Sequence, residues 1–227
     1  MISIIIPTYN EKENLPTLFQ KISNSLKGEL FELIIVDDNS PDGTADFAEY
    51  LSKTYKFVKI LKRSGKLGLA TAIKDGLKLA NGEIVLIMDA DLSHPPEIIP
   101  KLLKAIDDKD IAIGSRLVEG GGVKNWPMHR KIISKGGDAL ARIALGVKVS
   151  DPMSGFFALK KEIFEKTKIR TTGYKILLNI LYDNPNAKVA EVPYIFKDRF
   201  RGETKLGAKE SINYIFDIFR IRAKAVK

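Results

Sequence analysis

The chain has 227 residues, of which 44% are hydrophobic and 29% charged, a balance typical of one sizeable globular domain. It contains no cysteine, so disulfides, thiolate catalysis and cysteine-ligated zinc are excluded, and its two histidines are too few for a histidine-rich metal site. The amino terminus lacks the features of a signal peptide, and no apolar run approaches the roughly 18–20 residues that span a bilayer. We therefore expect an intracellular protein that is soluble or peripheral to a membrane.

The net charge of +9 is distributed unevenly along the chain. Residues 1–113 hold 14 Lys and Arg against 17 Asp and Glu, whereas residues 114–227 hold 23 against 11. A basic half indicates an anionic partner, such as nucleic acid, an anionic membrane surface or a phosphorylated substrate, although scattered lysines on a solvated face would explain part of the excess. The chain has no aromatic-interleaved basic strand and no nucleic-acid-binding motif, so we do not expect nucleic acid as the partner.

Short apolar runs alternate with amphipathic segments along the first half of the chain. Unbroken apolar character predicts strands at 3–7, 33–36, 57–61, 84–88 and 110–114. Apolar spacing and turn residues predict helices at 11–26, 44–53, 69–79 and 98–106. This alternation predicts an α/β fold with a mostly parallel central sheet flanked by helices and joined by right-handed crossovers.

The second half of the chain is less regular. The predicted elements there are, in order, a helix at 128–145, a turn and strand within 151–159, a helix from 173 and a strand at 188–196. The arginines, lysines and glycine of 197–206 are typical of a mobile surface loop, and also of a lid that closes over a phosphate. Residues 207–227 are predicted to form an amphipathic basic helix, which would dock on its own domain or lie at an anionic membrane surface.

Each of the first four predicted strands ends in a polar loop, and parallel strands bring such loops to one edge of the sheet. The fourth loop contains Asp89 and Asp91, whose side chains in extended chain would point to the same side, about 6.5–7 Å apart. Two adjacent carboxylates repel unless a cation lies between them, and an oxygen-rich site suits Mg²⁺ or Mn²⁺. Alternatively, Asp91 would cap the following helix and Asp89 would be a solvated strand end. The pair alone does not decide between these interpretations.

Two other loops carry residues suited to binding a nucleotide. Tyr9 follows Pro7, beyond the first strand, where its ring would stack on a base, although core packing is the ordinary role of a tyrosine. Asp37 and Asp38 form a second acidic pair. Residues 42–43 already account for the turn, so the pair is not needed to form it. We therefore interpret this pair as contacts to a ribose or a base. No G-x-G-x-x-G follows the first strand and no P-loop motif is present, so the predicted site has neither fingerprint.

Six short motifs follow one another along the chain: IIPTYNE at 5–11, VDDNSPDG at 36–43, MDADLSHPP at 88–96, GSR at 114–116, DPMSGFF at 151–157 and RFRGETK at 199–205. Together they resemble the family 2 glycosyltransferases, specifically the dolichol- or polyprenol-phosphate mannose synthases, from residue 2 to about 206. The resemblance implies a GT-A-like nucleotide-diphospho-sugar transferase fold. Its catalytic domain would cover 1–206, with a nucleotide-binding half at 1–113 and an acceptor half at 114–206, and the basic helix would follow at 207–227.

The resemblance also assigns roles to single residues. The guanosine pocket would be lined by Pro7, Tyr9, Glu11, Val36 and Asp38. The ribose and the metal on the diphosphate would be held by Asp89, Ala90 and Asp91, with Ser93 as a weaker metal ligand where some members carry glutamine. The acceptor phosphate would be held by Arg116, Arg130 and Ser134, and the donor or acceptor phosphates would also contact Lys175, Arg199 and Lys205. Catalysis would depend on Asp91, Arg116 and Arg130.

The implied reaction transfers mannose from GDP-mannose to dolichyl or polyprenyl phosphate, with Mg²⁺ or Mn²⁺, at the cytoplasmic face of a membrane with an anionic surface. A lipid phosphate is already ionised near neutral pH, so its oxygen would attack without a general base and invert the anomeric centre. Metal and basic side chains would offset the repulsion between the two anions. The alternatives are another donor, such as UDP-glucose, on the same class of acceptor, and a non-catalytic nucleotide-sugar or lipid binding module.

Overall fold

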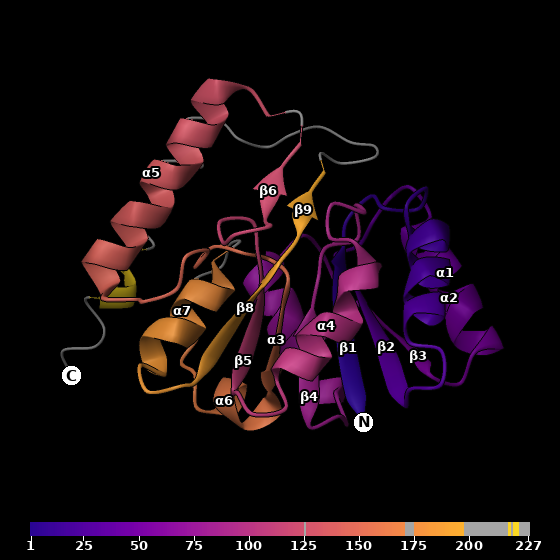
Figure 1. Ribbon diagram of the computed structural model, residues 1–227. Helices are drawn as coiled ribbons and strands as arrows, with labels where there is room; N and C mark the ends of the chain where they lie inside the picture. The colour runs from indigo at the N-terminus through magenta and orange to yellow at the C-terminus, as the bar shows by residue number, and fades with distance from the viewer. Residues whose placement is uncertain (125, 171–174, 198–217, 219, 223–227) are drawn as a thin grey trace.

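The computed structural model describes residues 1–124, 126–170, 175–197, 218 and 220–222. Of helix residues 129–133 and 135 it describes the backbone alone. Figure 1 shows a central sheet between two layers of helices, with one long helix set apart above the sheet. No helix in the described part combines the length and apolar character that crossing a membrane requires.

The central sheet has the strand order β3-β2-β1-β4-β7-β5-β8 among the described residues. These strands are β1 (Ile2–Thr8), β2 (Phe31–Asp37), β3 (Val58–Lys62), β4 (Ile84–Ile87), β5 (Ile111–Ser115), β7 (Phe157–Lys160) and β8 (Val189–Pro193). Strand β7 runs antiparallel to both of its neighbours, and every other pairing is parallel. The predicted mostly parallel sheet is therefore confirmed. The chain leaves β1 toward β2 and β3 on one side and returns to β4 on the other, which makes β1 and β4 a topological switch point.

The apolar strands are buried on both faces, because helices cover each side of the sheet. Along β1, Ile4 and Ile6 pack into one core while Ile5 packs into the other, and all three are fully buried. Successive side chains of a strand point to opposite faces, so a strand between two helical layers is apolar throughout. This is why the strands are unbroken apolar runs in the sequence.

The helices divide between the two faces of the sheet. One core includes side chains of α1 (Leu15–Ser25), α2 (Thr44–Thr54) and α4 (Ile99–Ala105), the last preceded by the 3₁₀ turn η1 (Pro96–Ile98). The other core includes α3 (Leu69–Leu79), α6 (Lys161–Glu165) and α7 (Ile176–Asp183). Helix α3 lies especially close to the sheet. A Cβ on Gly76 would stand 2.8 Å from a methyl of Ile5 and 3.0 Å from a methyl of Val36, so the close packing of α3 requires a glycine there.

Two elements lie beyond the edge at which the parallel strands end. Helix α5 (Met128–Leu145), predicted with the same bounds, runs obliquely above the sheet, and the short parallel pair β6 (Gly122–Val123) and β9 (Ile195–Phe196) stands beside it (Figure 1). Ala141 and Leu145 anchor α5 in a third apolar cluster with Leu178 of α7, Ile218 and Ile221. Most of the predicted helix 207–227 lies outside the described residues, but Ile218 and Ile221 are buried against the domain.

Among the predicted boundaries that differ from the structure, three affect how the chain leaves the sheet. The first helix begins at Leu15 rather than at residue 11, because residues 11–14 form a turn closed by the Glu11 carbonyl. The fourth strand ends at Ile87, two residues before the first aspartate of its loop. The predicted strand 188–196 is two strands, because Tyr194 bridges Ser115 and Gly122 through its backbone and directs the chain from the main sheet into the β6–β9 pair.

Candidate functional site

Six strands, β1 to β5 and β8, end at one edge of the sheet, and every described residue with a predicted site role lies at or above this edge, on α5 or next to α7. Strands β1 to β4 are parallel to one another, and β5 has the same direction because β7 runs antiparallel to both β4 and β5. The loops that follow β1, β2, β3, β4 and β5 therefore leave the sheet on one side. In open α/β sheets the crevice at this edge, beside the switch point, is the usual place of a ligand.

The residues predicted to line a guanosine pocket come from two adjacent strand ends. Pro7 of β1 lies directly opposite Val36 of β2 in the parallel register, and Tyr9 and Asp38 follow them. The ammonium of Lys66 lies 3.9 Å from the centre of the Tyr9 ring, a cation–π contact. The fold therefore places Pro7, Val36, Tyr9 and Asp38 at two adjacent strand ends, and their role in a guanosine pocket stays a prediction.

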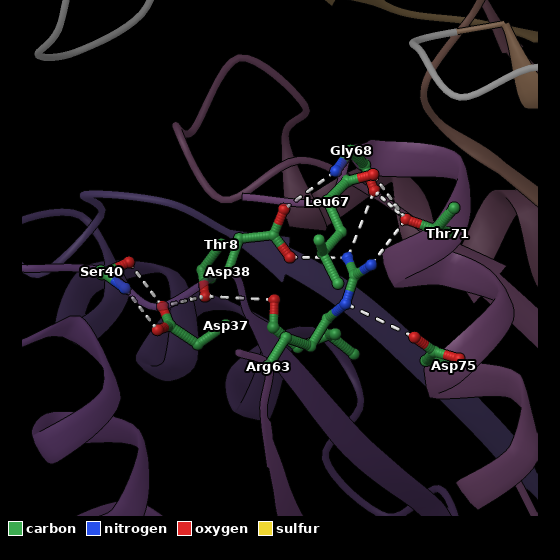
Figure 2. A network of polar contacts seen from close by, with 10 residues as sticks. Thr8, Asp37, Asp38, Ser40, Arg63, Leu67, Gly68, Thr71 and Asp75 are labelled. Atoms are coloured by element: carbon green, nitrogen blue, oxygen red, sulfur yellow. Dashed lines mark hydrogen bonds and ion pairs between the residues drawn. The ribbon is translucent and has the colours of Figure 1, made fainter. Parts of the chain in front are cut away.

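Asp37 builds the turn at this edge. Its carboxylate accepts hydrogen bonds from the Thr8 hydroxyl at 2.9 Å and from the backbone N–H and hydroxyl of Ser40 at 2.8 and 2.6 Å (Figure 2). The backbone N–H of Glu11 donates in turn to the Thr44 hydroxyl at 2.9 Å, which ties the loop after β1 to the start of α2. Asp37 therefore shapes the turn, and its interpretation as a contact to a ribose or a base stays a prediction. Asp42 shapes the start of α2, because its carboxylate accepts hydrogen bonds from the backbone N–H and the hydroxyl of Thr44.

Asp38 is held by a residue that the sequence did not single out. Nη1 of Arg63 lies 2.6 Å from Oδ1 of Asp38 in a buried ion pair, and the N–H of Gly68 donates to the other carboxylate oxygen at 3.3 Å. Nη2 of Arg63 donates to the Thr71 hydroxyl at 2.6 Å, and Nε lies 3.4 Å from Asp75 (Figure 2). The pair joins the loop after β2, the basic loop after β3 and the start of α3. Arg63 is the sole arginine among residues 1–113, and this feature of the sequence could have identified it as a candidate site residue.

The loop with the two neighbouring aspartates is irregular rather than extended. Asp91 and Ala90 are buried, whereas the Asp89 side chain is 32% exposed. Oδ1 of Asp91 accepts from the backbone N–H of Ser93 at 3.1 Å and from its hydroxyl at 2.6 Å. Between them Leu92 has φ of 63°, a left-handed conformation that is strained for a branched side chain. Asp91 therefore closes a local turn. The alternative that it caps the following helix is wrong, since neither η1 nor α4 has a side-chain cap.

The Asp89 backbone is positioned by His94. The N–H of Asp89 donates to Nδ1 of His94 at 3.0 Å, so Nδ1 is the acceptor nitrogen and the ring proton lies on Nε2. The imidazole stacks on Phe156 with ring centres 5.2 Å apart. A Cβ on Gly155 would lie 3.2 Å from the imidazole and 3.4 Å from a carboxylate oxygen of Asp89. The DPMSGFF motif therefore packs directly against the Asp89 loop.

Arg116, at the end of β5, forms a buried bidentate pair with Asp151. Nε and Nη2 of Arg116 donate to the two carboxylate oxygens at 2.8 and 2.6 Å, and the Arg116 backbone N–H donates at 2.9 Å. Glu191 of β8 fixes the partner by accepting the N–H of Asp151 at 3.1 Å. Burial opposes the charge of the guanidinium, but the hydrogen bonds and the negative charge of Asp151 outweigh it and raise the pKa of Arg116. Asp151 lies in a quoted motif, but sequence reasoning assigned it no role.

The other predicted phosphate contacts are distributed over the upper part of the molecule. Arg130 and Ser134 lie four residues apart on α5, and Lys175 immediately precedes α7. The Arg130 side chain lies outside the described part, as do Arg199 and Lys205 entirely. Of the basic loop 197–206 only Lys197 is described. It lines a cavity of about 160 Å³ beside the aspartate loop, together with Ser93 and the ion pair between Lys21 and Glu97.

The chain matches the family described as glycosyl transferase family 2 over residues 3–168. It is 50% identical over 223 residues to a dolichol-phosphate mannosyltransferase of Pyrococcus furiosus, covering 97% of this chain and 63% of that protein. It is 38% identical over 225 residues to the Saccharomyces cerevisiae protein of the same name, covering 94% of this chain and 84% of the relative. The chain thus spans less than two thirds of the Pyrococcus relative.

The fold is also that of solved structures with little sequence similarity. Glucosyl-3-phosphoglycerate synthase from Mycobacterium tuberculosis, solved with Mn²⁺, UDP-glucose and phosphoglyceric acid, superposes with a TM-score of 0.74 at 20% identity. The alignment covers 97% of this chain and 79% of that one. The likeness confirms the predicted GT-A-like architecture at the level of the fold.

Proposed function

This chain belongs to glycosyl transferase family 2, and we propose that it transfers mannose from GDP-mannose to the phosphate of a dolichyl or polyprenyl phosphate. The relatives named dolichol-phosphate mannosyltransferase support this choice of sugar and acceptor. The observation that carries the proposal is that the Asp89–Asp91 loop and Arg116 leave the same edge of one sheet. That edge therefore presents two carboxylates for a metal-bound diphosphate and a fixed guanidinium for a second anion.

The donor would bind across the ends of β1, β2 and β4. Tyr9 would stack on the base, and Asp38, held in place by Arg63, would accept hydrogen bonds from the amino and imino groups of guanine. Glu11, Pro7 and Val36 would complete the base pocket. Because Asp38 is already bonded to Arg63, its carboxylate keeps one orientation before the donor arrives. Such preorganisation reduces the conformational cost of binding.

A divalent metal fits the chemistry of the Asp89–Asp91 loop. Mg²⁺ and Mn²⁺ prefer oxygen ligands, and Mg²⁺ commonly takes one or two carboxylates and completes its shell with water and substrate phosphates. The described residues contain no group of three or more acidic, histidine or cysteine side chains that would enclose an ion unaided. Asp89 and Asp91 would therefore hold the metal, with Ser93 orienting Asp91. When bound, the metal would neutralise charge on the leaving diphosphate.

The acceptor would be received by Arg116, with Arg130, Ser134 and Lys175 nearby. A phosphate monoester carries close to two negative charges at neutral pH, because its second pKa is about 6. Its oxygen is therefore a competent nucleophile and no residue has to remove a proton from it. Direct attack on the anomeric carbon inverts that centre, so an α-linked donor would give a β-linked lipid product.

The long helix α5 suits an acceptor that lies in a membrane. Ile143 is 84% exposed, and Met128 and Leu140 are also exposed on this helix, while Arg142 and Lys148 flank a shallow cavity at its end. Apolar and basic side chains side by side favour an anionic membrane surface. We therefore propose that the protein works as a peripheral enzyme on the cytoplasmic face of a membrane.

The test is transfer of radiolabelled mannose from GDP-mannose to polyprenyl phosphate in vesicles, with UDP-glucose assayed in parallel. We expect a β-linked lipid phosphate mannose and loss of transfer in excess EDTA. Asp91→Ala should abolish transfer, whereas Asp46→Ala, at a highly exposed aspartate of α2, should leave it unchanged. An α-linked product, transfer from UDP-glucose alone, or EDTA-resistant turnover by Asp91→Ala would contradict the proposal.

A further inference from the structure

Asp138, on α5, is a buried acid without a hydrogen-bond partner. The residue is 1% exposed, and neither carboxyl oxygen has a hydrogen-bond partner in the described structure. Ala141 and Leu145, on the same helical face, are anchored in the apolar cluster, so this face is directed into the protein. An unsatisfied buried carboxyl is costly, which makes Asp138 unusual in a fold whose other buried acids are bonded.

Asp138 shares its helical face with the predicted acceptor residues. Ser134 precedes it by one helical turn and Arg130 by two, spacings that place all three along one side of α5. The charges of Arg116 and Asp151 act electrostatically on the same carboxyl. Asp138 therefore shares one side of α5 with two residues expected to hold the acceptor phosphate, and its carboxyl is subject to the charge of Arg116, which is expected to hold the same phosphate.

The surrounding charges favour the neutral form of this carboxyl. Burial raises the pKa of Asp138 to about 7, the negative charge of Asp151 raises it as well, and Arg116 and Arg142 oppose the shift. The Arg116 guanidinium also interacts electrostatically with Tyr194, between β8 and β9, whose pKa burial raises. The Leu178, Ile218 and Ile221 side chains packed beneath α5 are apolar.

A ligand that bridges Arg116 and Asp138 needs a hydrogen-bond donor from each. The bond with Asp151 uses Nε and Nη2 of Arg116, so Nη1 lies outside that pairing. A protonated Asp138 has one O–H to donate, whereas an ionised Asp138 would repel a phosphate dianion. A phosphate oxygen is therefore a ligand that would satisfy the neutral carboxyl and the free edge of the guanidinium together.

On these grounds, and resting on the proposed function, we propose that Asp138 is an acceptor-binding residue that, as a neutral carboxylic acid, donates a hydrogen bond to the lipid phosphate held by Arg116. The acid neither attacks nor removes a proton from the substrate. Its proton is retained through the reaction, since the phosphate of the acceptor and that of the product are both anionic. Binding the phosphate should therefore stabilise the protonated form, so that the complex takes up a proton near neutral pH.

The test compares Asp138→Asn, which keeps a donor at every pH, with Asp138→Leu, which has none. Steady-state kinetics with GDP-mannose and a soluble short-chain prenyl phosphate would give KM for each substrate separately. Because Asp138→Leu would lose a hydrogen bond to a charged group, its acceptor KM should increase roughly 10- to 100-fold, with the GDP-mannose KM unchanged. For the wild type the acceptor KM should rise about tenfold per pH unit well above 7, beyond the change caused by ionisation of the phosphate itself. For Asp138→Asn that additional rise should vanish.

The matched control is Asp110→Asn, at the opposite end of β5, where hydrogen bonds from the Lys188 backbone and then from the Lys160 side chain lower the pKa of the carboxylate. It should keep the wild-type pH profile of acceptor KM. Asp138→Leu with wild-type acceptor KM would show that the buried acid is only structural and would overturn the proposal, as would an Asp138→Asn profile identical to that of the wild type. Should Asp138→Leu fail to fold, the Asp138→Asn profile decides by itself.

Calorimetric titration separates this proposal from the proposed function, because it needs no turnover. The short-chain prenyl phosphate would be titrated into wild type and Asp138→Asn at pH 7.5 in two buffers of different ionisation enthalpy. Proton uptake by the wild type and none by the variant supports the role of Asp138 even if mannose is not the sugar transferred. Equal proton uptake by the two proteins would refute it.

Discussion

Replacing Asp138 with asparagine should stabilise the protein, and the gain should grow with pH. Asparagine has almost the same shape and cannot ionise. The carboxyl has a pKa of about 7 in the folded protein against an ordinary value of 3.8, so the folded state holds a proton that the unfolded chain has lost between these values. The wild type is therefore at full stability below about pH 3.8 and loses stability as pH rises to about 7. The gap corresponds to about 4 kcal/mol as an upper bound, since local opening would admit water.

The assay is urea unfolding of wild type and Asp138→Asn at pH 4.5, 6 and 8. The difference in the free energy of unfolding should be small at the first pH and should reach several kcal/mol at the last. Asp110→Asn provides a control of opposite sign. Its carboxylate has a lowered pKa, so its contribution to stability is present above the unfolded pKa and is lost in acid. A gain at Asp138→Asn that does not change between pH 4.5 and 8 would refute the claim that burial of the acid controls its protonation.

Three further substitutions have clear expected outcomes. Arg63→Met leaves Asp38 buried without its ion-pair partner. We expect the free energy of unfolding in urea to fall by about 3–5 kcal/mol and GDP binding by calorimetry to weaken. Unchanged GDP affinity in a folded variant would contradict the role of the pair in the base pocket. Gly82→Ala would place a Cβ 2.7 Å from the backbone of β1, so the free energy of unfolding measured by thermal denaturation should fall by about 1–3 kcal/mol. A wild-type melting temperature would show that the backbone at this strand end moves to accommodate the methyl group. Arg116→Lys removes the bidentate hydrogen bonding with Asp151, and acceptor KM should rise while the GDP-mannose KM stays constant. A change in the GDP-mannose KM alone would show that Arg116 acts on the donor and not on the acceptor.

The sequence was sufficient for the architecture of the sheet because buried parallel strands leave an unmistakable apolar pattern. Ile4, Ile5 and Ile6 are consecutive and apolar because each lies against one of two helical layers. Parallel strands, once recognised, bring their terminal loops to one edge without further information. Local spacing also predicted α5 with its observed bounds, since a helix is determined by residues that are near in sequence.

Pairings between distant residues required the tertiary structure. Strand β7 enters the sheet between β4 and β5 in the antiparallel direction, and no local pattern distinguishes that from an edge strand. The same limit applies to the acidic pair after β2. Asp37 and Asp38 are indistinguishable by position along the chain, yet one shapes a turn with Thr8 and Ser40 while the other binds Arg63, 25 residues away.

What the sequence determined by itself is therefore the layer order, the edge that carries the chemistry and the residue types collected there. Only the tertiary structure decided which of those side chains are already bonded. Arg116 was expected to face a substrate phosphate and is found with Asp151 on one edge of its guanidinium. Asp138 drew no notice as one acid in a basic helix. Its significance comes from burial without a hydrogen-bond partner among the described residues, a property that depends on the groups folded around it and on no neighbour in sequence.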